Sequence, residues 1–394
     1  MSIIIGILGL VVVLGLAYIM SNDKKAIDYK AVGIMLVMQV VLTLIMFKTS
    51  IGLTVIEAIG NGFSKVIEIG REGVTFVIGG WVPEGNSVFF VNVLLIIIFT
   101  SMLLSVLTYL RILPLIIKYL GGFLSKITGL SSVTTFHAVN NIFFGQSEGL
   151  LAIKTHIHNM SNNKLFVISV SSMASVSASI MASYITMLPA KYVLGAMTLN
   201  ALSALIIGII MAPERNAAKN ESIDTENASP AKSIFESISV GALDGGKVAL
   251  IVAAMLIAYV GLMAVIDAGF NAIIGLSFTE ILGYVFAPIA WLMGIPASDI
   301  LVAGQTMGTK LATNEFVAML QFIEHIPDLS EKTVGIVSVF LISFANFSSI
   351  GIISGSMQAI NGEKAAIISK FGLKMLLAAT MVSMLTATLV GIFI

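Results

Sequence analysis

Long apolar runs separated by short polar segments dominate the chain. A helix that crosses the hydrocarbon of a bilayer needs about 20 apolar residues. Eight runs meet this length: 3–20, 31–50, 88–110, 163–187, 192–212, 245–270, 334–360 and 368–394. Eight crossings place both termini on the same side of the membrane. The first run follows no basic segment and precedes no clear cleavage site, so we interpret it as a retained span.

Two further apolar segments are interrupted by polar residues. Residues 131–157 are interrupted around Gly145, and residues 295–323 around Thr313 and Asn314. Each segment is too broken for one crossing but long enough for two half-helices that enter and return. Such a re-entrant hairpin is tolerated at membrane depth only where protein buries it or water lines it. The pattern therefore predicts an all-α polytopic membrane protein with eight transmembrane helices and two re-entrant hairpins.

The remaining segments predict helices that lie along the membrane surface and one polar linker. The surface helices are shorter or more amphipathic than the spans. They are expected at 51–80, 112–128, 231–243 and 278–293, and the linker at 213–230.

An internal repeat organises the hairpins and the later spans. In residues 131–187 and again in 295–360, a hairpin with a polar tip precedes a span broken by small polar residues. An odd number of crossings separates the two units, so the second is inverted relative to the first. Paired broken helices in inverted repeats are typical of secondary transporters, with the site at the midplane.

The repeats suggest a division of the chain into four parts. Residues 1–110 are expected to be mostly scaffold, and 111–212 to form the first transport repeat. Residues 213–243 are expected to hold the cytoplasmic linker and a surface helix. Residues 244–394 are expected to contain a scaffold span and then the second transport repeat.

Composition supports the membrane assignment and excludes several function classes. The chain is 57% hydrophobic and only 11% charged, whereas soluble domains are about 25% charged. Its formal net charge of zero argues against a nucleic-acid partner. There is no cysteine, so neither a disulfide nor a thiolate metal site is available. No nucleotide-binding or hydrolase motif occurs in a credible context, so we expect neither an enzyme nor an organic cofactor.

Basic residues give an orientation. If the loop that contains Lys24 and Lys25 is cytoplasmic, 15 of the 21 lysines and arginines lie on the cytoplasmic side. This bias predicts that both termini are outside and that the linker is inside.

The tip of the first hairpin, Gly145-Gln146-Ser147-Glu148, carries candidate chemistry. Glycine allows the chain to turn, and the half-helix that follows presents unpaired N–H groups. Amide, hydroxyl and carboxylate together suit an uncharged ligand with alternating donors and acceptors, such as a heterocyclic base. An ionisable group within a membrane is functional by default, although Glu148 could instead lie at an aqueous end.

The tip of the second hairpin holds Asn314 and Glu315. A carboxylate beside an amide suits vicinal hydroxyls, because each hydroxyl can donate to one and accept from the other. Lys310, on the same hairpin, is read as a lysine that extends to the membrane surface. The broken spans add small polar residues near Ser175 and around Asn346, which free backbone carbonyls for a ligand or a cation. Most other serines there are read as helix-packing residues.

These motifs resemble the concentrative nucleoside transporter family. The resemblance rests on GQSE at 145–148, TKLATNEFVAM at 309–319 and VSVFLISFANFSSIGIISG at 337–355. It extends over nearly the whole chain and matches the bacterial members with eight spans. It implies a homotrimer in the bacterial inner membrane that moves nucleosides by an elevator-like displacement. The substrate residues that it implies are Gln146, Ser147, Glu148 and Ile180 on the base side, and Glu315, Phe344, Asn346 and Ser349 on the ribose side.

The resemblance also implies a sodium site between the first hairpin and the break in the fourth span. Its ligands would be the side chains of Asn141 and Ser175 and the carbonyls near Phe144 and Val176. Hard oxygen ligands suit an alkali cation. Many bacterial relatives are proton-coupled instead, and Asn141 favours sodium. A passive pore is a rival class, although the polar groups gather at two tips and two breaks rather than along one path.

Overall fold

The computed structural model describes residues 2–79, 88–214, 229 and 231–394, and all regular structure within these ranges is helical. Most of the expected linker at 213–230 lies outside the described residues. The elements in the first half are α1 (Ser2–Ile19), η1 (Lys24–Ala26), α2 (Tyr29–Lys48), α3 (Ser50–Ile78), η3 (Phe90–Leu94), α4 (Ile96–Tyr109), α5 (Ile112–Thr128), α6 (Ser132–Asn140), α7 (Gln146–Leu151), α8 (Lys154–Ile157), α9 (Asn162–Met173), α10 (Ala178–Ile185) and α11 (Ala190–Met211). The second half contains α12 (Ile234–Ile274), α13 (Phe278–Leu292), α14 (Ile300–Ala312), α15 (Glu315–His325), η4 (Ile326–Asp328), α16 (Glu331–Leu341), α17 (Phe347–Ile360), α18 (Gly362–Lys370) and α19 (Gly372–Phe393).

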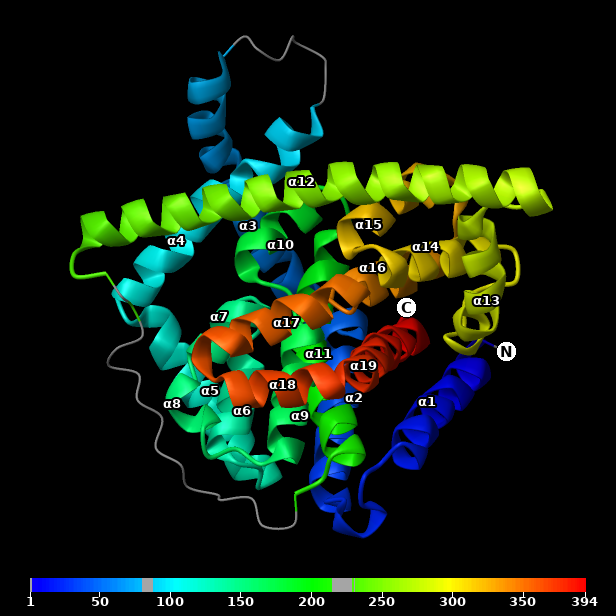
Figure 1. Ribbon diagram of the computed structural model, residues 1–394, viewed down its shortest axis with the longest axis horizontal. Coiled ribbons are helices and arrows are strands. Elements are labelled where there is room, and N and C mark those ends of the chain that lie inside the picture. Colours follow the sequence, from blue (N-terminus) through cyan, green and yellow to red (C-terminus); the bar gives the residue numbers. More distant parts are fainter. Residues whose placement is uncertain (1, 80–87, 215–228, 230) are drawn as a thin grey trace.

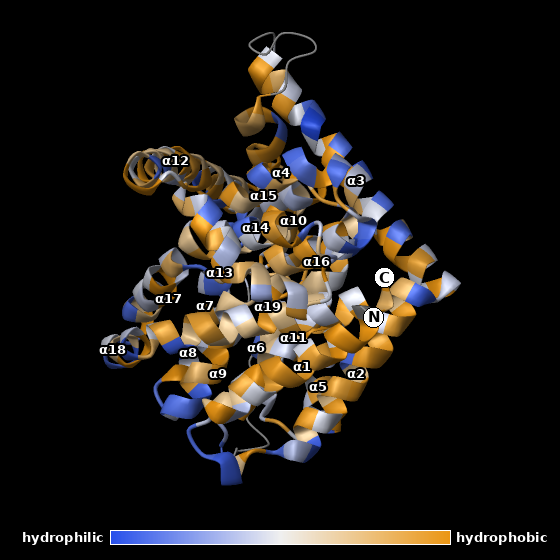
Figure 2. Ribbon diagram, turned by 90° about the vertical axis from the view of Figure 1, so that its right-hand side faces the viewer, coloured by the Kyte–Doolittle hydropathy of each residue, from blue (hydrophilic) through white to orange (hydrophobic). Residues whose placement is uncertain are grey.

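The predicted spans correspond to apolar helices. Among the described residues, six segments are long and apolar enough to cross a bilayer: α2, η3 with α4, α9 with α10, α11, α12 and α19. The shorter apolar helix α1 and the broken pair α16–α17 complete the eight expected crossings. Figure 2 shows the helices as largely apolar, with polar residues gathered at loops and along one side of α3. The protein is therefore an all-α polytopic membrane protein.

Helix α12 corrects one boundary. Residues 231–243, expected to form a separate surface helix, are instead continuous from Ile234 with the span predicted at 245–270. The result is one helix of 41 residues, which lies across the molecule in Figure 1. It packs along α4, where a Cβ on Gly241 would lie 2.6 Å from Ser105 Cβ and one on Gly245 2.7 Å from Ile97 O. These glycines permit close approach of the two helices.

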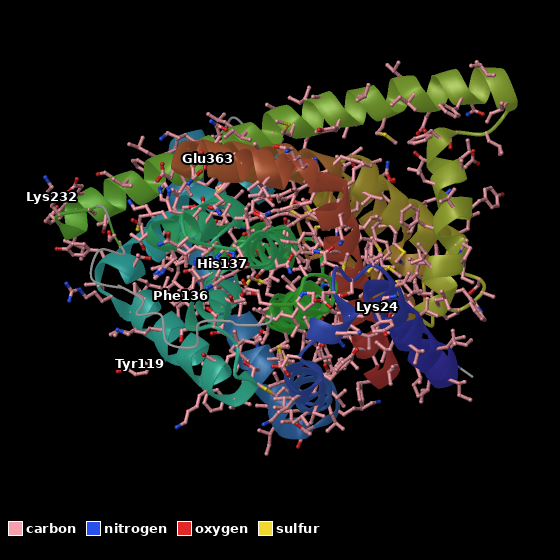
Figure 3. The ribbon with its side chains drawn as sticks, turned by 60° about the horizontal axis from the view of Figure 1, so that its bottom comes forward. Lys24, Tyr119, Phe136, His137, Lys232 and Glu363 are labelled. Atoms are coloured by element: carbon pink, nitrogen blue, oxygen red, sulfur yellow. The ribbon has the colours of Figure 1, made fainter. Side chains whose placement is uncertain are left out.

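The core surrounds α9, α11, α16 and α19. These four helices are buried over most of their length. Figure 3 shows Phe136 and His137 of α6 inside the bundle, whereas Tyr119 and Lys232 lie at its edge. Each terminal helix packs against the other, and a Cβ on Gly6 would lie 2.8 Å from Ile392. The two termini therefore lie together, as Figures 1 and 2 also show.

Candidate functional site

Helices α6 and α7 form the first hairpin (hairpin 1). Helix α6 ends at Asn140, and α7 begins at Gln146 with Gly145 as its N-terminal cap residue. The φ angle of Gly145 is −69°, which any residue adopts, so the turn does not use the conformational freedom of glycine. Space explains it better, because a Cβ there would lie 2.9 Å from Glu148 Oε2 and 3.5 Å from Ser177 Cβ.

Helices α14 and α15 form the second hairpin (hairpin 2). Helix α14 ends at Ala312, and Asn314 caps α15 by accepting a hydrogen bond from the backbone N–H of Val317 at 3.0 Å. A side-chain acceptor at this position satisfies one of the N–H groups left free at a helix start. The cap fixes Glu315 as the first residue of α15, at the turn of the hairpin.

Each hairpin is followed by a helix pair with an irregular break. Break 1 comprises residues 174–177, between α9 and α10, and break 2 comprises residues 342–346, between α16 and α17. Asn346 caps α17, because its side-chain oxygen accepts from the N–H of Ser349 at 3.0 Å and from Ser348 Oγ at 2.7 Å. Both predicted interruptions are therefore real.

Helix boundaries define how the two repeats correspond. Helices α15 and α17 begin 169 residues after α7 and α10 (315 against 146, and 347 against 178). The counterpart of Glu315 is therefore Gln146, the first residue of α7. Glu148, two residues further on, is therefore not the equivalent of Glu315.

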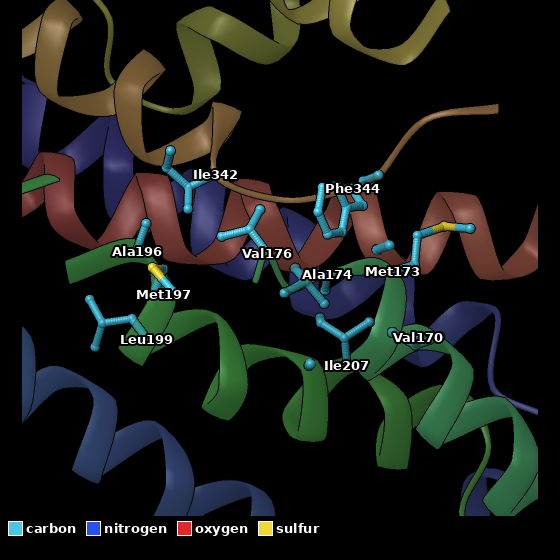
Figure 4. Close-up of a cluster of buried hydrophobic side chains, with 14 of the residues drawn as sticks. Val170, Met173, Ala174, Val176, Ala196, Met197, Leu199, Ile207, Ile342 and Phe344 are labelled. Atoms are coloured by element: carbon cyan, nitrogen blue, oxygen red, sulfur yellow. The ribbon is translucent and has the colours of Figure 1, made fainter. Parts of the chain in front are cut away.

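The two breaks lie against each other at the centre of the protein. The backbone N–H of Phe344 in break 2 donates to the carbonyl of Ser175 in break 1 at 3.2 Å. The N–H of Ala178 donates to the carbonyl of Phe143 at 3.0 Å, which attaches break 1 to the turn of hairpin 1. Figure 4 shows Val176 and Phe344 side by side above α11. Polar backbone from both repeats is thus gathered in one place.

Glu315 lies at this junction with both of its carboxylate oxygens paired. Its side chain is 4% exposed. Oε1 accepts a hydrogen bond from the Tyr184 hydroxyl at 2.9 Å, and Oε2 accepts from Asn346 Nδ2 at 3.3 Å. Phe344 and Ser349 are also buried there. Tyr184 is a site residue that the sequence alone did not reveal.

The tip of hairpin 1 is less completely paired. The side-chain oxygen Oε1 of Gln146 is buried and has no hydrogen-bond partner among the described residues. Ser147 Oγ accepts from Ser356 Oγ of α17 at 2.7 Å. Glu148 is exposed, and Ile180 of α10 is buried. An amide acceptor and a carboxylate are therefore available to an incoming polar ligand.

The residues expected to bind a cation are distributed between hairpin 1 and break 1. Asn141 Oδ1 is buried without a partner in the described part of the chain, while Nδ2 donates to Ser171 Oγ of α9 at 3.3 Å. Ser175 Oγ donates to the carbonyl of Ser172 at 2.9 Å and keeps its lone pairs. Phe144 is partly buried, and Val176 is buried. An unpaired amide oxygen beside a hydroxyl is a donor set that fits an alkali cation.

Two neighbours of Asn141 were not found from the sequence. A Cβ on Gly149 would lie 2.0 Å from Asn141 Oδ1, so only glycine leaves room for this oxygen. The ring nitrogens of His137 lie 3.1 Å from the Gly149 carbonyl and 3.2 Å from the Ile168 carbonyl, and Nε2 lies 3.0 Å from Asn141 Nδ2. His137 thereby joins both arms of hairpin 1 to α9.

Lys310 does not extend to the membrane surface as expected, and a second charged residue of hairpin 2, Asp299, is buried too. Lys310 is 1% exposed, and its Nζ donates to the carbonyl of Phe340 at 2.5 Å. Asp299 is also buried, and it accepts hydrogen bonds from Ser330 Oγ at 2.8 Å and Thr333 Oγ1 at 2.6 Å. Asp299 thus ties the start of hairpin 2 to the start of α16.

The fold and the central junction define a polytopic membrane transporter built from inverted repeats. Three sequence profiles match the chain: "Na+ dependent nucleoside transporter N-terminus" at residues 8–81, "Nucleoside recognition" at 90–191, and "Na+ dependent nucleoside transporter C-terminus" at 192–391. The chain therefore belongs to the concentrative nucleoside transporter family, whose members are transporters and permeases rather than enzymes.

Individual relatives agree with this assignment over the full length. The purine nucleoside transport protein NupG of Bacillus subtilis is 35% identical, with 100% of both chains covered. The nucleoside permease NupC of Helicobacter pylori is 35% identical, over 100% of this chain and 98% of that one. Sodium/nucleoside cotransporter 1 of Mus musculus is 29% identical over 98% of this chain and 63% of its own.

Solved structures show the same fold. The structure of CNTnw in an inward-facing substrate-bound state is 31% identical, with a TM-score of 0.95 over 100% of this chain and 99% of that one. A doubly substituted CNTnw in an outward-facing state gives a TM-score of 0.94 at 30% identity, over 100% of this chain and 98% of that one. One fold of this type is thus found in CNTnw with either face open.

Proposed function

We propose that this protein is a cation-coupled importer of nucleosides, with sodium as the coupling ion. The observation that carries the proposal is the central junction, where break 1 and break 2 are hydrogen-bonded through Phe344 and Ser175. Hairpin 2 brings a carboxylate with both oxygens paired, and the tip of hairpin 1 brings a buried amide oxygen without a partner among the described residues. A ligand with two chemically different halves would be held between them.

Glu315, Asn346 and Ser349 would bind the ribose. A carboxylate accepts hydrogen bonds from two neighbouring hydroxyls, and an amide can donate to one of them. Tyr184 would hold the carboxylate in position, since its hydroxyl donates to Oε1 at 2.9 Å. Phe344 would pack against the nucleoside. In a buried setting these charge-assisted hydrogen bonds are worth about 1.5–3 kcal/mol each.

Gln146, Ser147 and Glu148 would read the base from hairpin 1, and Ile180 would provide an apolar contact beside it. The buried Gln146 Oε1 has no partner among the described residues, and a donor on the base edge would satisfy it. A buried acceptor left unpaired costs about 1–3 kcal/mol, so this position favours a bound substrate.

Asn141 and Ser175, with the carbonyls near Phe144 and Val176, would hold the sodium ion. Bound there, an ion would attach hairpin 1 to break 1 and so position the base-reading tip. Substrate and ion would then raise each other's affinity by the same factor, as linkage requires. This is the physical basis of coupling in the proposal.

The wider assembly follows from the same assignment. We place the protein in the bacterial inner membrane as a homotrimer, with both termini outside and with elevator-like movement of the transport repeats. The pairing of α1 with α19 supports termini on one side, and the basic-residue bias supports which side that is.

Counterflow in proteoliposomes tests the carrier assignment. Vesicles preloaded with unlabelled uridine should transiently accumulate labelled uridine above its external concentration, because a carrier exchanges substrate. A pore would only equilibrate the label. Recovery of chemically unchanged uridine would exclude an enzyme. Competition by uridine but not by 2′,3′-dideoxyuridine would test the ribose site in the same preparation.

A further inference from the structure

Lys310 is a buried cation that the proposed transport site does not use. Its ammonium has three N–H donors, and three oxygens accept them. These are the Phe340 carbonyl at 2.5 Å, Ser343 Oγ at 2.6 Å and Ser383 Oγ at 3.5 Å. The ammonium also lies 4.5 Å from the centre of the Phe340 ring. All three N–H donors of this buried lysine are thus hydrogen-bonded to oxygens, and such a set of oxygens could equally coordinate a bound metal cation.

Lys310 occupies a place in hairpin 2 similar to that of Asn141 in hairpin 1. Helix α14 begins 168 residues after α6 (300 and 132), and α15 and α17 begin 169 residues after α7 and α10, so Lys310 lies within one residue of the counterpart of Asn141. Both residues also contact the helix that follows their hairpin, because Asn141 Nδ2 donates to Ser171 Oγ of α9 at 3.3 Å and Lys310 Nζ donates to the Phe340 carbonyl of α16 at 2.5 Å. The last residues of α9 and α16 are 168 apart (173 and 341), which brings Ser343 opposite Ser175.

We propose that the Lys310 ammonium is a resident cation that holds hairpin 2 against break 2, as the counterpart of the ion that hairpin 1 would bind. Hairpin 2 would therefore need no free ion. The ammonium joins α14 to the end of α16, to break 2 and to α19. Lys310 and Glu315 also interact electrostatically within the same buried hairpin. Lys310 is thus a positioning residue for Glu315 and Asn346.

The analogy with an ion at Asn141 rests on the proposed function, whereas the Lys310 contacts do not. The test is therefore the variant Lys310→Asn, which gives hairpin 2 the residue of hairpin 1. Asparagine is shorter and carries an oxygen, and it leaves the Phe340 and Ser343 oxygens facing a vacated volume. Uptake of uridine into proteoliposomes is measured against sodium concentration, with choline as the replacement cation. Lys310→Met, without charge or oxygen, and Lys247→Asn, at an exposed lysine, are the controls.

We expect the Hill coefficient for sodium to rise from about 1 in the parent to about 2 in Lys310→Asn, since it is bounded by the number of sites. Lys247→Asn should behave as the parent. Lys310→Met should lose discrimination between uridine and 2′,3′-dideoxyuridine, which a merely structural role would not predict. Unchanged sodium steepness in an inserted Lys310→Asn protein, or full discrimination in Lys310→Met, overturns the proposal.

Two further outcomes keep this proposal separate from the proposed function. If parent uptake ignores sodium but Lys310→Asn becomes sodium-activated, the ion assignment at Asn141 fails and the Lys310 assignment stands. If Lys310→Asn does not insert, the reciprocal variant Asn141→Lys replaces it. A resident ammonium in hairpin 1 should make uptake independent of sodium, and continued sodium dependence of an inserted Asn141→Lys protein overturns the proposal.

Discussion

The two hairpins have the same outline, but the proposed site residues are paired in one and partly unpaired in the other. In hairpin 2, Glu315 already has hydrogen bonds from Tyr184 and Asn346, and Lys310 has three acceptors. In hairpin 1, Gln146 Oε1 and Asn141 Oδ1 are buried without partners among the described residues. The protein itself therefore pairs Glu315 and Lys310 in hairpin 2, whereas in hairpin 1 we propose that the bound substrate and ion supply the missing partners.

The largest effect is expected when the carboxylate of Glu315 is removed from hairpin 2. We expect Glu315→Gln to reduce uridine uptake by at least about 100-fold, because the carboxylate accepts two charge-assisted hydrogen bonds worth about 1.5–3 kcal/mol each. The protein should still fold and insert. The matched control is Glu331→Gln, at a side chain 81% exposed, where little change is expected. Near-normal uptake by Glu315→Gln would contradict the ribose assignment.

A large effect is also expected at the unpaired amide of hairpin 1. Asn141→Ala should raise the sodium concentration for half-maximal uptake by about 10–100-fold, the range typical of weakened metal sites. Uridine affinity at saturating sodium should change much less. Asn271→Ala, at an exposed asparagine of α12, is the control. An unchanged sodium response in Asn141→Ala would remove sodium from this site.

A substitution at Gly149 tests the position of Asn141 Oδ1 without changing any of the proposed sodium ligands. Gly149→Ala would place a methyl group where Asn141 Oδ1 now lies, and we expect the sodium requirement to rise by about 10-fold because the oxygen must move. Gly122→Ala, where a Cβ meets nothing within 4 Å, should behave as the parent. Equal behaviour of the two variants would mean that the position of this oxygen does not matter.

Tyr184 tests whether hairpin 2 depends on its internal hydrogen bonds. Tyr184→Phe removes one hydroxyl donor to Glu315, so we expect the KM for uridine to rise by about 5–10-fold. The sodium requirement should be less affected. Tyr284→Phe, at a tyrosine that is 60% exposed, is the control. A larger effect on sodium than on uridine would contradict the assigned role.

The smallest expected effect concerns base reading. Ser147→Ala should change uptake by about 3–5-fold, since one neutral hydrogen bond is worth about 1 kcal/mol. It should also alter the ratio of purine to pyrimidine transport. Ser356→Ala removes the same Ser147–Ser356 hydrogen bond without touching the proposed base site. If both variants alter the ratio equally, Ser147 acts only through Ser356.

Local patterns predicted the hairpins and the breaks, because polar residues that interrupt an apolar segment indicate irregular backbone, and within a membrane such backbone must be buried by protein or face water. Such patterns do not reveal which residues meet across the fold. Tyr184 and Glu315 are 131 residues apart, and nothing local to either residue indicates their contact. Lys310 was read as a lysine that extends to the surface because the sequence does not show that α16 and α19 cover it. The start of α12 was misplaced because the sequence does not show that Gly241 and Gly245 pack closely against α4 within one continuous helix.

The most direct test of the central claim is uptake by the purified protein in proteoliposomes under an imposed ion gradient. With an inward sodium gradient and no proton gradient, labelled uridine should accumulate above its external concentration. The accumulation should disappear when a sodium ionophore collapses the gradient. Accumulation that follows a proton gradient and ignores sodium would contradict the assigned ion. Equilibration without accumulation under either gradient would contradict coupled transport itself.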